Sequence, residues 1–323
     1  MRISIALATY NGAKYLPEQL ESFINQTRQP DELIVSDDGS TDNTREILQR
    51  FAETAPFEVH LCVNGGSGGY ASNFNSSIMQ TTGDLVFLSD QDDLWFPQKL
   101  EFIEKLAQEN TDYLLFMNDA ALTDADLNDT GLTKLGQFRS LGIPERQFVM
   151  GCCCAAKRDL LDLCLPIPDG FKAHDDWIVS FAAGLGAKMI CRQVLQYYRR
   201  HNNNESQLMV NRTTKVKKWY RYKEFASRVR SPVPEDLAQS EVLQQQLILS
   251  GIQRAQKRTT GRFTHQLKTM ESQSRAILSM LETRMDIRRK CLPARFVASL
   301  SNWLRGGYRL ASGFKSLVRD LRG

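Results

Sequence analysis

A repeated alternation of strand-like and helical segments in the first 110 residues limits the folds that this chain can adopt. Short runs of strand-forming residues occur at 2–8, 32–36, 57–63 and 85–88, and stretches with apolar residues at helical spacing follow at 15–27, 40–54, 71–81 and 97–110. Such alternation favours an α/β sheet that is mostly parallel, with functional groups at the carboxyl ends of its strands. The sequence therefore predicts a Rossmann-like mixed sheet flanked by helices.

Acidic residues crowd the end of the strand-like segment 85–88. Asp90, Asp92 and Asp93 follow it directly. Neighbouring carboxylates repel one another, and Mg²⁺ or Mn²⁺ would offset the repulsion because these cations prefer oxygen ligands and share their sites with substrate phosphates. A solvated acidic turn is the alternative, and for Asp93 we expect a cap on the helix that starts near Pro97.

Other strand ends carry turns that could hold a small molecule. The first strand ends at Ala8, Thr9, Tyr10 and Asn11, and the second at Asp37 and Asp38. The glycine-rich loop 64–70 lacks the G-x-G-x-x-G spacing and the following acidic residue of a dinucleotide-binding loop. We expect a flexible loop that shapes a binding pocket, with Asn73 lining it.

Charge divides the chain into two parts. Residues 1–204 hold 17 Lys and Arg against 28 Asp and Glu, a net charge of −11, whereas residues 205–323 hold 24 against 9, a net charge of +15. This split predicts an acidic catalytic domain over 1–205 and a basic helical region over 206–323 that attaches to an anionic surface or polymer.

The basic region has the pattern of amphipathic helices with Trp, Phe and Arg, which suits anionic lipid headgroups. Packing on the catalytic domain or self-association is the alternative. Nucleic acid is a weaker candidate, because no recognised reader motif is present. The chain has no apolar run of the length that spans a membrane, and its seven cysteines form no C-x-x-C pair. We therefore expect a cytoplasmic protein, peripheral on the inner face of the cytoplasmic membrane.

Taken together, these segments resemble the inverting glycosyltransferases of family 2, which have the GT-A fold. The pieces that carry the resemblance lie over about residues 1–205 and are 8–12, 37–42, 69–83, Asp90 to Asp93, Gly151-Cys152 and Asp175-Asp176. The stretches 88–95, 174–177 and 198–203 are also similar to the rhamnosyltransferases of bacterial surface polysaccharides. This subgroup usually has His-Asp-Trp-Trp where the chain has His174-Asp175-Asp176-Trp177.

The resemblance implies a nucleotide site and a metal site. The nucleotide would be held by residues from several strand ends: Ala8, Thr9, Tyr10, Asn11, Asp37, Asp38, Asn73, Asp90, Gln91 and Arg200. Asp38 would contact the imide N–H of the base. Asp92 is the expected ligand of Mg²⁺ or Mn²⁺, and Asp90 would contact either the metal or the ribose. His201 would complete the metal shell or hold phosphate, with a surface basic cluster as the alternative.

Inversion at the sugar carbon also requires a general base opposite the leaving diphosphate. Asp175 is the expected base, and Asp176 is the alternative, because a carboxylate at a helix start is also a good cap. These residues imply transfer of a sugar from a dTDP- or UDP-sugar, with dTDP-rhamnose as one candidate, to a hydroxyl of a lipid-linked saccharide. A non-catalytic sugar-nucleotide scaffold is the alternative, and an NAD(P)-dependent oxidoreductase is disfavoured by the glycine spacing.

Overall fold

The computed structural model describes residues 1–64, 69–202, 204, 206, 208–220, 234–259, 261–311 and 313–322. It contains two compact units, Met1–Lys218 and Trp219–Gly323. Residues 206–218 belong to the first unit, although the sequence-based boundary lay before them, and Val210 and Val216 are buried. The functional division into a catalytic and an attachment domain stays a prediction.

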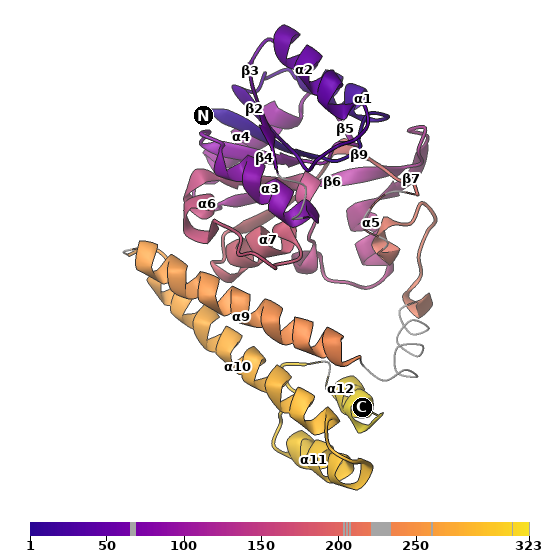
Figure 1. Ribbon diagram of the computed structural model, residues 1–323, viewed down its shortest axis with the longest axis vertical. Helices are drawn as coiled ribbons and strands as arrows, with labels where there is room; N and C mark the ends of the chain where they lie inside the picture. The colour runs from indigo at the N-terminus through magenta and orange to yellow at the C-terminus, as the bar shows by residue number, and fades with distance from the viewer. Residues whose placement is uncertain are drawn as a thin grey trace. The chain divides into compact units, whose positions relative to one another are not determined.

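The first unit is built on one mixed sheet (Figure 1). Its strand order is β3 (Glu58–Val63), β2 (Glu32–Asp37), β1 (Ile3–Thr9), β4 (Leu85–Ser89), β8 (Cys154–Lys157), β6 (Leu115–Thr123), β9 (Lys188–Arg199) and β5 (Leu94–Trp95), with β7 (Asp129–Thr133) paired to β6. The strands from β3 to β4 are parallel, as are β6 and β9, whereas β8 is antiparallel to both its neighbours. The expected mixed α/β sheet is confirmed.

Helices cover both faces of this sheet, which is why its central strands are apolar on both sides. The helices of the unit are α1 (Leu16–Ile24), α2 (Thr44–Thr54), α3 (Gly69–Met79), α4 (Lys99–Glu109), α5 (Lys134–Ser140), α6 (Arg158–Cys164) and α7 (His174–Gly184). Ile5 and Leu7 of β1 share a buried core with Leu20 and Phe23 of α1. The opposite side of β1 and β2 packs against α3.

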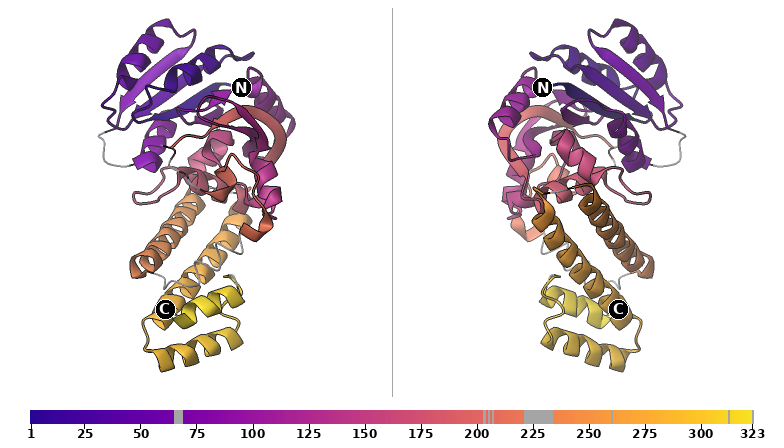
Figure 2. Two further views of the ribbon diagram at one scale, coloured as in Figure 1. Left: turned by 90° about the vertical axis from the view of Figure 1, so that its right-hand side faces the viewer. Right: turned by 90° about the vertical axis from the view of Figure 1, so that its left-hand side faces the viewer.

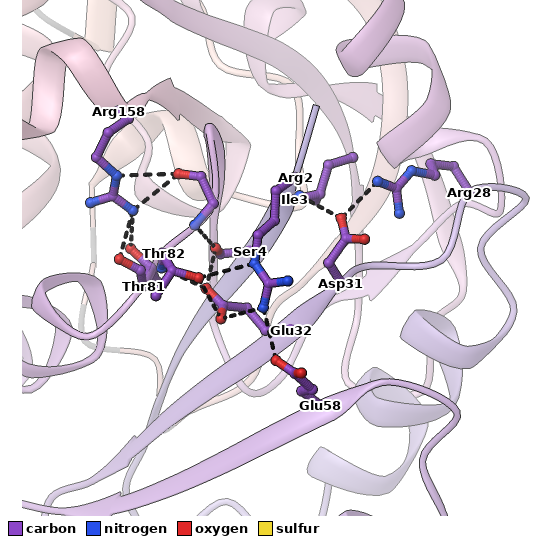
Figure 3. Close-up of polar contacts among 11 residues, drawn as sticks. Arg2, Ile3, Ser4, Arg28, Asp31, Glu32, Glu58, Thr81, Thr82 and Arg158 are labelled. Atoms are coloured by element: carbon purple, nitrogen blue, oxygen red, sulfur yellow. Dashed lines mark hydrogen bonds and ion pairs between the residues drawn. The ribbon is translucent and has the colours of Figure 1, made fainter.

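A buried carboxylate joins the amino-terminal ends of β1 and β2 to the turn before β4 (Figure 3). Glu32 is 1% exposed and accepts hydrogen bonds from Oγ of Ser4 at 2.5 Å, from the backbone N–H of Thr82 at 2.6 Å, and from Arg2 at 3.2 Å. Burial opposes ionisation, but these hydrogen bonds lower the pKa of Glu32 to about 2. The charged carboxylate therefore stabilises the sheet at the amino-terminal ends of its parallel strands.

The second unit is helical. Its described part contains α9 (Glu235–Arg258), α10 (Thr264–Arg288), α11 (Leu292–Leu304) and α12 (Phe314–Arg322), and α9 and α10 lie side by side (Figures 1 and 2). Asp320 of α12 is fully buried and accepts hydrogen bonds from Arg284 and Arg288 of α10, each at 2.8 Å. No helix of the described chain has both the length and the apolar character needed to cross a membrane.

Candidate functional site

A cavity of about 880 Å³ opens at the carboxyl ends of β1 and β4, between α3, α5 and α7. Most of the residues predicted for the site line it: Ala8, Thr9, Tyr10, Asp38, Asn73, Asp90, Gln91, Asp92, Asp175 and Asp176. Asn11, Asp37, Arg200 and His201 are not part of its lining. Segments far apart in the sequence are thus gathered at one edge of the sheet, where functional groups of such sheets lie.

Two hydrogen bonds connect the turns after β1 and β4. The side-chain amide of Gln91 donates to the carbonyl of Tyr10 at 2.9 Å and accepts from its N–H, also at 2.9 Å. Gly12 makes this pairing possible, because a Cβ there would lie 2.1 Å from Oε1 of Gln91. Asn73 is 3% exposed and donates to the carbonyl of Thr9 at 3.0 Å, which fixes α3 against the same turn.

Asp37 and Asn11 shape these turns from behind the cavity wall. The Asp37 carboxylate is buried and accepts from Thr9 at 3.0 Å, from Oγ of Ser40 at 2.5 Å and from Arg45 at 2.7 Å. Burial acts against ionisation of Asp37, but these bonds lower its pKa. The side-chain oxygen of Asn11 accepts from the backbone of Thr41 at 2.8 Å.

Asp38 differs from Asp37 because it reaches the cavity. Desolvation and the charge of Asp37 raise the pKa of Asp38. Its Oδ1 is buried and has no hydrogen-bond partner in the described part of the chain. An acceptor in this state suits a ligand N–H, and the contact of Asp38 with a nucleobase stays a prediction. Residues 65–68 of the glycine-rich loop lie outside the described residues.

Asp90, Asp92 and His201 form the candidate metal centre. Nε2 of His201 lies 2.8 Å from Oδ2 of Asp92, and Asn204 donates to the same oxygen at 3.0 Å. The His201 ring stacks on Tyr15 with centroids 4.6 Å apart. Desolvation and the charges of Asp92 and Asp175 raise the pKa of Asp90 to about 7. This mutual repulsion of oxygen ligands is what a hard divalent cation would relieve, so the side chains fit Mg²⁺ or Mn²⁺.

A second group of possible metal ligands also includes Asp90. Single ligand atoms of Asp90, Asp93 and Cys152 lie within 4.8 Å of one another. Burial raises the pKa of the Cys152 thiol well above its usual value, so the thiol stays protonated at neutral pH, whereas metal binding requires the thiolate. The Asp93 carboxylate already accepts from Gln196 at 2.8 Å. The grouping therefore suits a hard cation poorly. Asp90, Asp92 and His201 are the better set by ligand type, but their ligand atoms do not all lie within 4.8 Å of one another.

The expected role of Asp93 as a helix cap is wrong. The chain first forms β5 (Leu94–Trp95), and Gln98 occupies the cap position of α4. Asp93 is fully buried, and burial together with the charges of Asp92 and Asp90 raises its pKa well above the usual value. The cap prediction failed because pairing of β5 with β9 cannot be read from local spacing.

The candidate base lies in the first turn of α7. Asp175 accepts from the backbone N–H of Gly151 at 3.2 Å and from that of Asp176 at 2.9 Å, which orients its carboxylate. Desolvation and the charge of Asp175 raise the pKa of Asp176. Both carboxylates line the cavity. Because Asp175 also raises the pKa of Asp90, the candidate base and the candidate metal centre lie close enough to interact across it.

Lys134 and Tyr198 line the cavity but were missed from the sequence. Lys134 is 3% exposed, donates to the side chain of Asn211, and places its ammonium 4.8 Å from the centre of the Tyr198 ring. Burial lowers the pKa of Lys134 to about 8. Arg200 lies beside the same ring, 5.6 Å from its centre. No local pattern in the sequence marks Lys134, which begins α5.

The whole chain aligns with the solved structure of S. aureus TarS 1–349 in complex with UDP-GlcNAc, covering 90% of that chain with a TM-score of 0.56 at 16% identity. Together with the sheet described above, this likeness shows an α/β fold of the GT-A type. The sequence model of Glycosyl transferase family 2 matches residues 4–162. Residues 4–162 therefore belong to this family.

Two relatives extend the comparison beyond the family match. The chain is 31% identical over 218 residues to the uncharacterized glycosyltransferase alr2836 of Nostoc sp. The alignment covers 63% of this chain and 66% of that protein. It is 27% identical over 255 residues to the dTDP-rhamnosyl transferase RfbG of Shigella flexneri, covering 67% of this chain and 81% of that one. The predicted family and fold are therefore confirmed.

Proposed function

We propose that the protein is an inverting, metal-dependent glycosyltransferase acting in the biosynthesis of a bacterial surface polysaccharide. One observation carries the proposal: Asp38, Asp92 and Asp175, which come from different elements, line a single cavity. Their three carboxylates could meet three requirements of sugar transfer, namely a base contact, a diphosphate-holding cation and a proton acceptor. The donor is a dTDP- or UDP-sugar, and the likeness to RfbG favours dTDP-rhamnose.

In this mechanism Tyr10, Asp38 and Asn73 hold the nucleoside at the end of β1. Asp92 and Asp90, with His201 behind them, would hold Mg²⁺ or Mn²⁺, which when bound offsets the charge on the departing diphosphate. The backbone N–H of Gly151 keeps the Asp175 carboxylate directed into the cavity.

The reaction itself is an in-line displacement at the anomeric carbon. The acceptor hydroxyl attacks the carbon on the face opposite the diphosphate, and its proton passes to Asp175. The bond from the carbon to the diphosphate oxygen breaks, and the leaving group keeps the electron pair. The configuration at the carbon is thereby inverted.

A sugar-transfer assay with variants tests these roles. Asp175→Asn should lower kcat by at least about 100-fold while nucleotide-sugar binding persists, because a positioned base contributes about that much. Asp92→Asn should abolish the stimulation by Mn²⁺. Asp169→Asn is the matched control, because Asp169 is exposed and outside the cavity.

The same assay separates the alternatives. If Asp176→Asn loses sugar transfer and Asp175→Asn does not, Asp176 is the base. A wild-type protein that binds nucleotide sugars without transferring them is the result expected of a scaffold, and it would refute the enzyme proposal. Retention of configuration at the transferred sugar would refute inversion.

We also propose that the second unit attaches the protein to an anionic membrane that carries the lipid-linked acceptor. Leu304 is 78% exposed, Leu292 69% and Phe314 65%, so α11 and α12 present large apolar side chains to solvent. Basic side chains accompany them: Arg295, Arg305, Arg309, Lys315, Arg319 and Arg322. Apolar groups that insert between acyl chains, beside cations that meet anionic headgroups, are typical of an interfacial helix.

A further inference from the structure

His174, the first residue of α7, is held rigidly in the wall of the cavity. It is 4% exposed. Its ring stacks on Phe74 with centroids 3.7 Å apart and planes 17° from parallel, and the edge of Tyr70 meets it at 5.9 Å. The aromatic contacts fix the plane of the imidazole without using either ring nitrogen.

Neither nitrogen of this imidazole has a hydrogen-bond partner among the residues that the structure describes. An unsatisfied buried polar group costs about 1–3 kcal/mol. A phenylalanine would make the same stack with Phe74 without that cost. Contact of the nitrogens with a bound molecule would remove this cost.

The backbone opposite His174 is shaped to admit the ring. A Cβ at residue 151 would lie 2.6 Å from Nε2 of His174, so only Gly151 allows the present position without a shift. Gly151 also donates its N–H to Asp175. The imidazole and the candidate base thus contact the same glycine, and both residues line the cavity.

The chemistry of the ring selects the kind of ligand. Burial lowers the pKa of His174 to about 4, although Asp175 acts in the opposite direction, so the ring is neutral at pH 7. A neutral imidazole offers one donor and one acceptor. Diphosphate offers acceptors only and is better matched by cations, whereas a sugar hydroxyl both donates and accepts.

We infer that His174 binds a hydroxyl of the saccharide that lies beside Asp175 and so contributes to the choice of sugar. This inference rests on the proposed function. The hydroxyl belongs to the donor sugar or to the acceptor, and both present the same chemistry to the ring. A site built to bond a hydroxyl discriminates strongly against an analogue that lacks it, because its own polar groups are then left unpaired.

The informative variant is His174→Phe, which keeps an aromatic ring on Phe74 and removes the nitrogens, although the new ring is slightly larger. We expect its melting temperature to stay within a few degrees of that of the wild type, because the loss of an unsatisfied polar group offsets the cost of the larger ring. We expect kcat/KM for sugar transfer to fall about 10- to 100-fold. Affinity for dTDP or UDP alone should stay unchanged. His174→Asn, which keeps one donor and one acceptor, should recover part of the activity.

Titrations in the presence of Mn²⁺ distinguish the two sources of the hydroxyl. If the donor supplies it, His174→Phe loses affinity for dTDP-rhamnose or UDP-glucose relative to the free nucleotide. If the acceptor supplies it, that ratio is unchanged and the KM for the acceptor rises.

Wild-type transfer kinetics in His174→Phe would overturn the inference. The inference would also be overturned if His174→Phe lowered both the melting temperature and the activity and His174→Asn restored no activity. Those results would show that His174 acts only in packing. A wild-type protein that binds no nucleotide sugar overturns the proposed function together with this inference, whereas an active wild type lets the His174 inference fail alone.

Discussion

At the scale of single residues, the site depends on side chains that hold other side chains in place. Gln91 lines the cavity, yet both of its hydrogen bonds go to the backbone of Tyr10, and they exist because Gly12 leaves room for them. The turn at Tyr10, which follows β1, is therefore positioned by a residue that follows β4. Gly12 and Gln91 should matter for binding more than for stability.

Gly12→Ala tests this dependence. The added methyl group would displace the flexible end of Gln91, which can move at little cost, so we expect the melting temperature to change by less than about 2 °C. Nucleotide affinity should fall about 5- to 20-fold because the Tyr10 turn loses both hydrogen bonds. Gln91→Ala should reproduce the loss, and the double variant should add nothing to it. Additive losses in thermal-shift titrations would show that the two residues act separately.

Part of the site could be predicted from the sequence because strand ends are local features. Asp38 and Asp90 follow runs that are recognisable as strands, so their gathering at one sheet edge could be expected. The proximity of His201 to Asp92 and the entry of Lys134 into the cavity depend on pairings between distant segments. No spacing in the sequence carries that information.

At the scale of elements, the sheet has acidic residues at its cavity end and a network of hydrogen bonds around Glu32 at the opposite end. Glu32 connects β1, β2 and the turn before β4, and it does so while fully ionised. The alternation of strands and helices made β1 to β4 predictable. The short strands β5 and β7 were not, because each exists only through pairing with β9 or β6.

Glu32→Gln should lower the free energy of unfolding by about 1–3 kcal/mol at pH 7. The folded-state pKa of about 2 lies below the ordinary value of 4.5, so the carboxylate stabilises the fold above pH 4.5 and loses this effect as pH falls toward 2. Denaturant titrations at pH 7 and pH 3 should therefore show a smaller difference between variant and wild type at the lower pH. Glu58→Gln is the control, since Glu58 contacts Arg2 but is exposed. A difference that does not depend on pH would contradict the assignment.

At the scale of the whole molecule, charge separates the chain into an acidic part that includes the cavity and a basic part that includes the exposed apolar helices. The sequence predicted this separation well, because it is a matter of composition. It did not predict which apolar side chains stay exposed, because that depends on how α10, α11 and α12 pack.

Vesicle co-sedimentation tests the attachment proposal. Replacing Leu292 and Leu304 by Gln should reduce binding to vesicles of phosphatidylglycerol about 10-fold, because both are highly exposed apolar side chains of α11. Wild-type binding should weaken with salt and be poor on phosphatidylcholine. Soluble-acceptor activity serves as the control for folding. Equal binding to both lipids, or no effect of the paired substitution, would refute the proposal.

The position of Asp320 has a practical consequence for such experiments. This carboxylate lies close to the carboxyl terminus and is the acid that neutralises Arg284 and Arg288. Removing one partner of a buried ion pair costs about 3–5 kcal/mol, since the remaining charge is left uncompensated. Deleting the last few residues would thus destabilise α10 as well as remove part of α12. Weaker vesicle binding of such a truncated protein would then reflect a disrupted helical unit rather than the loss of a membrane contact.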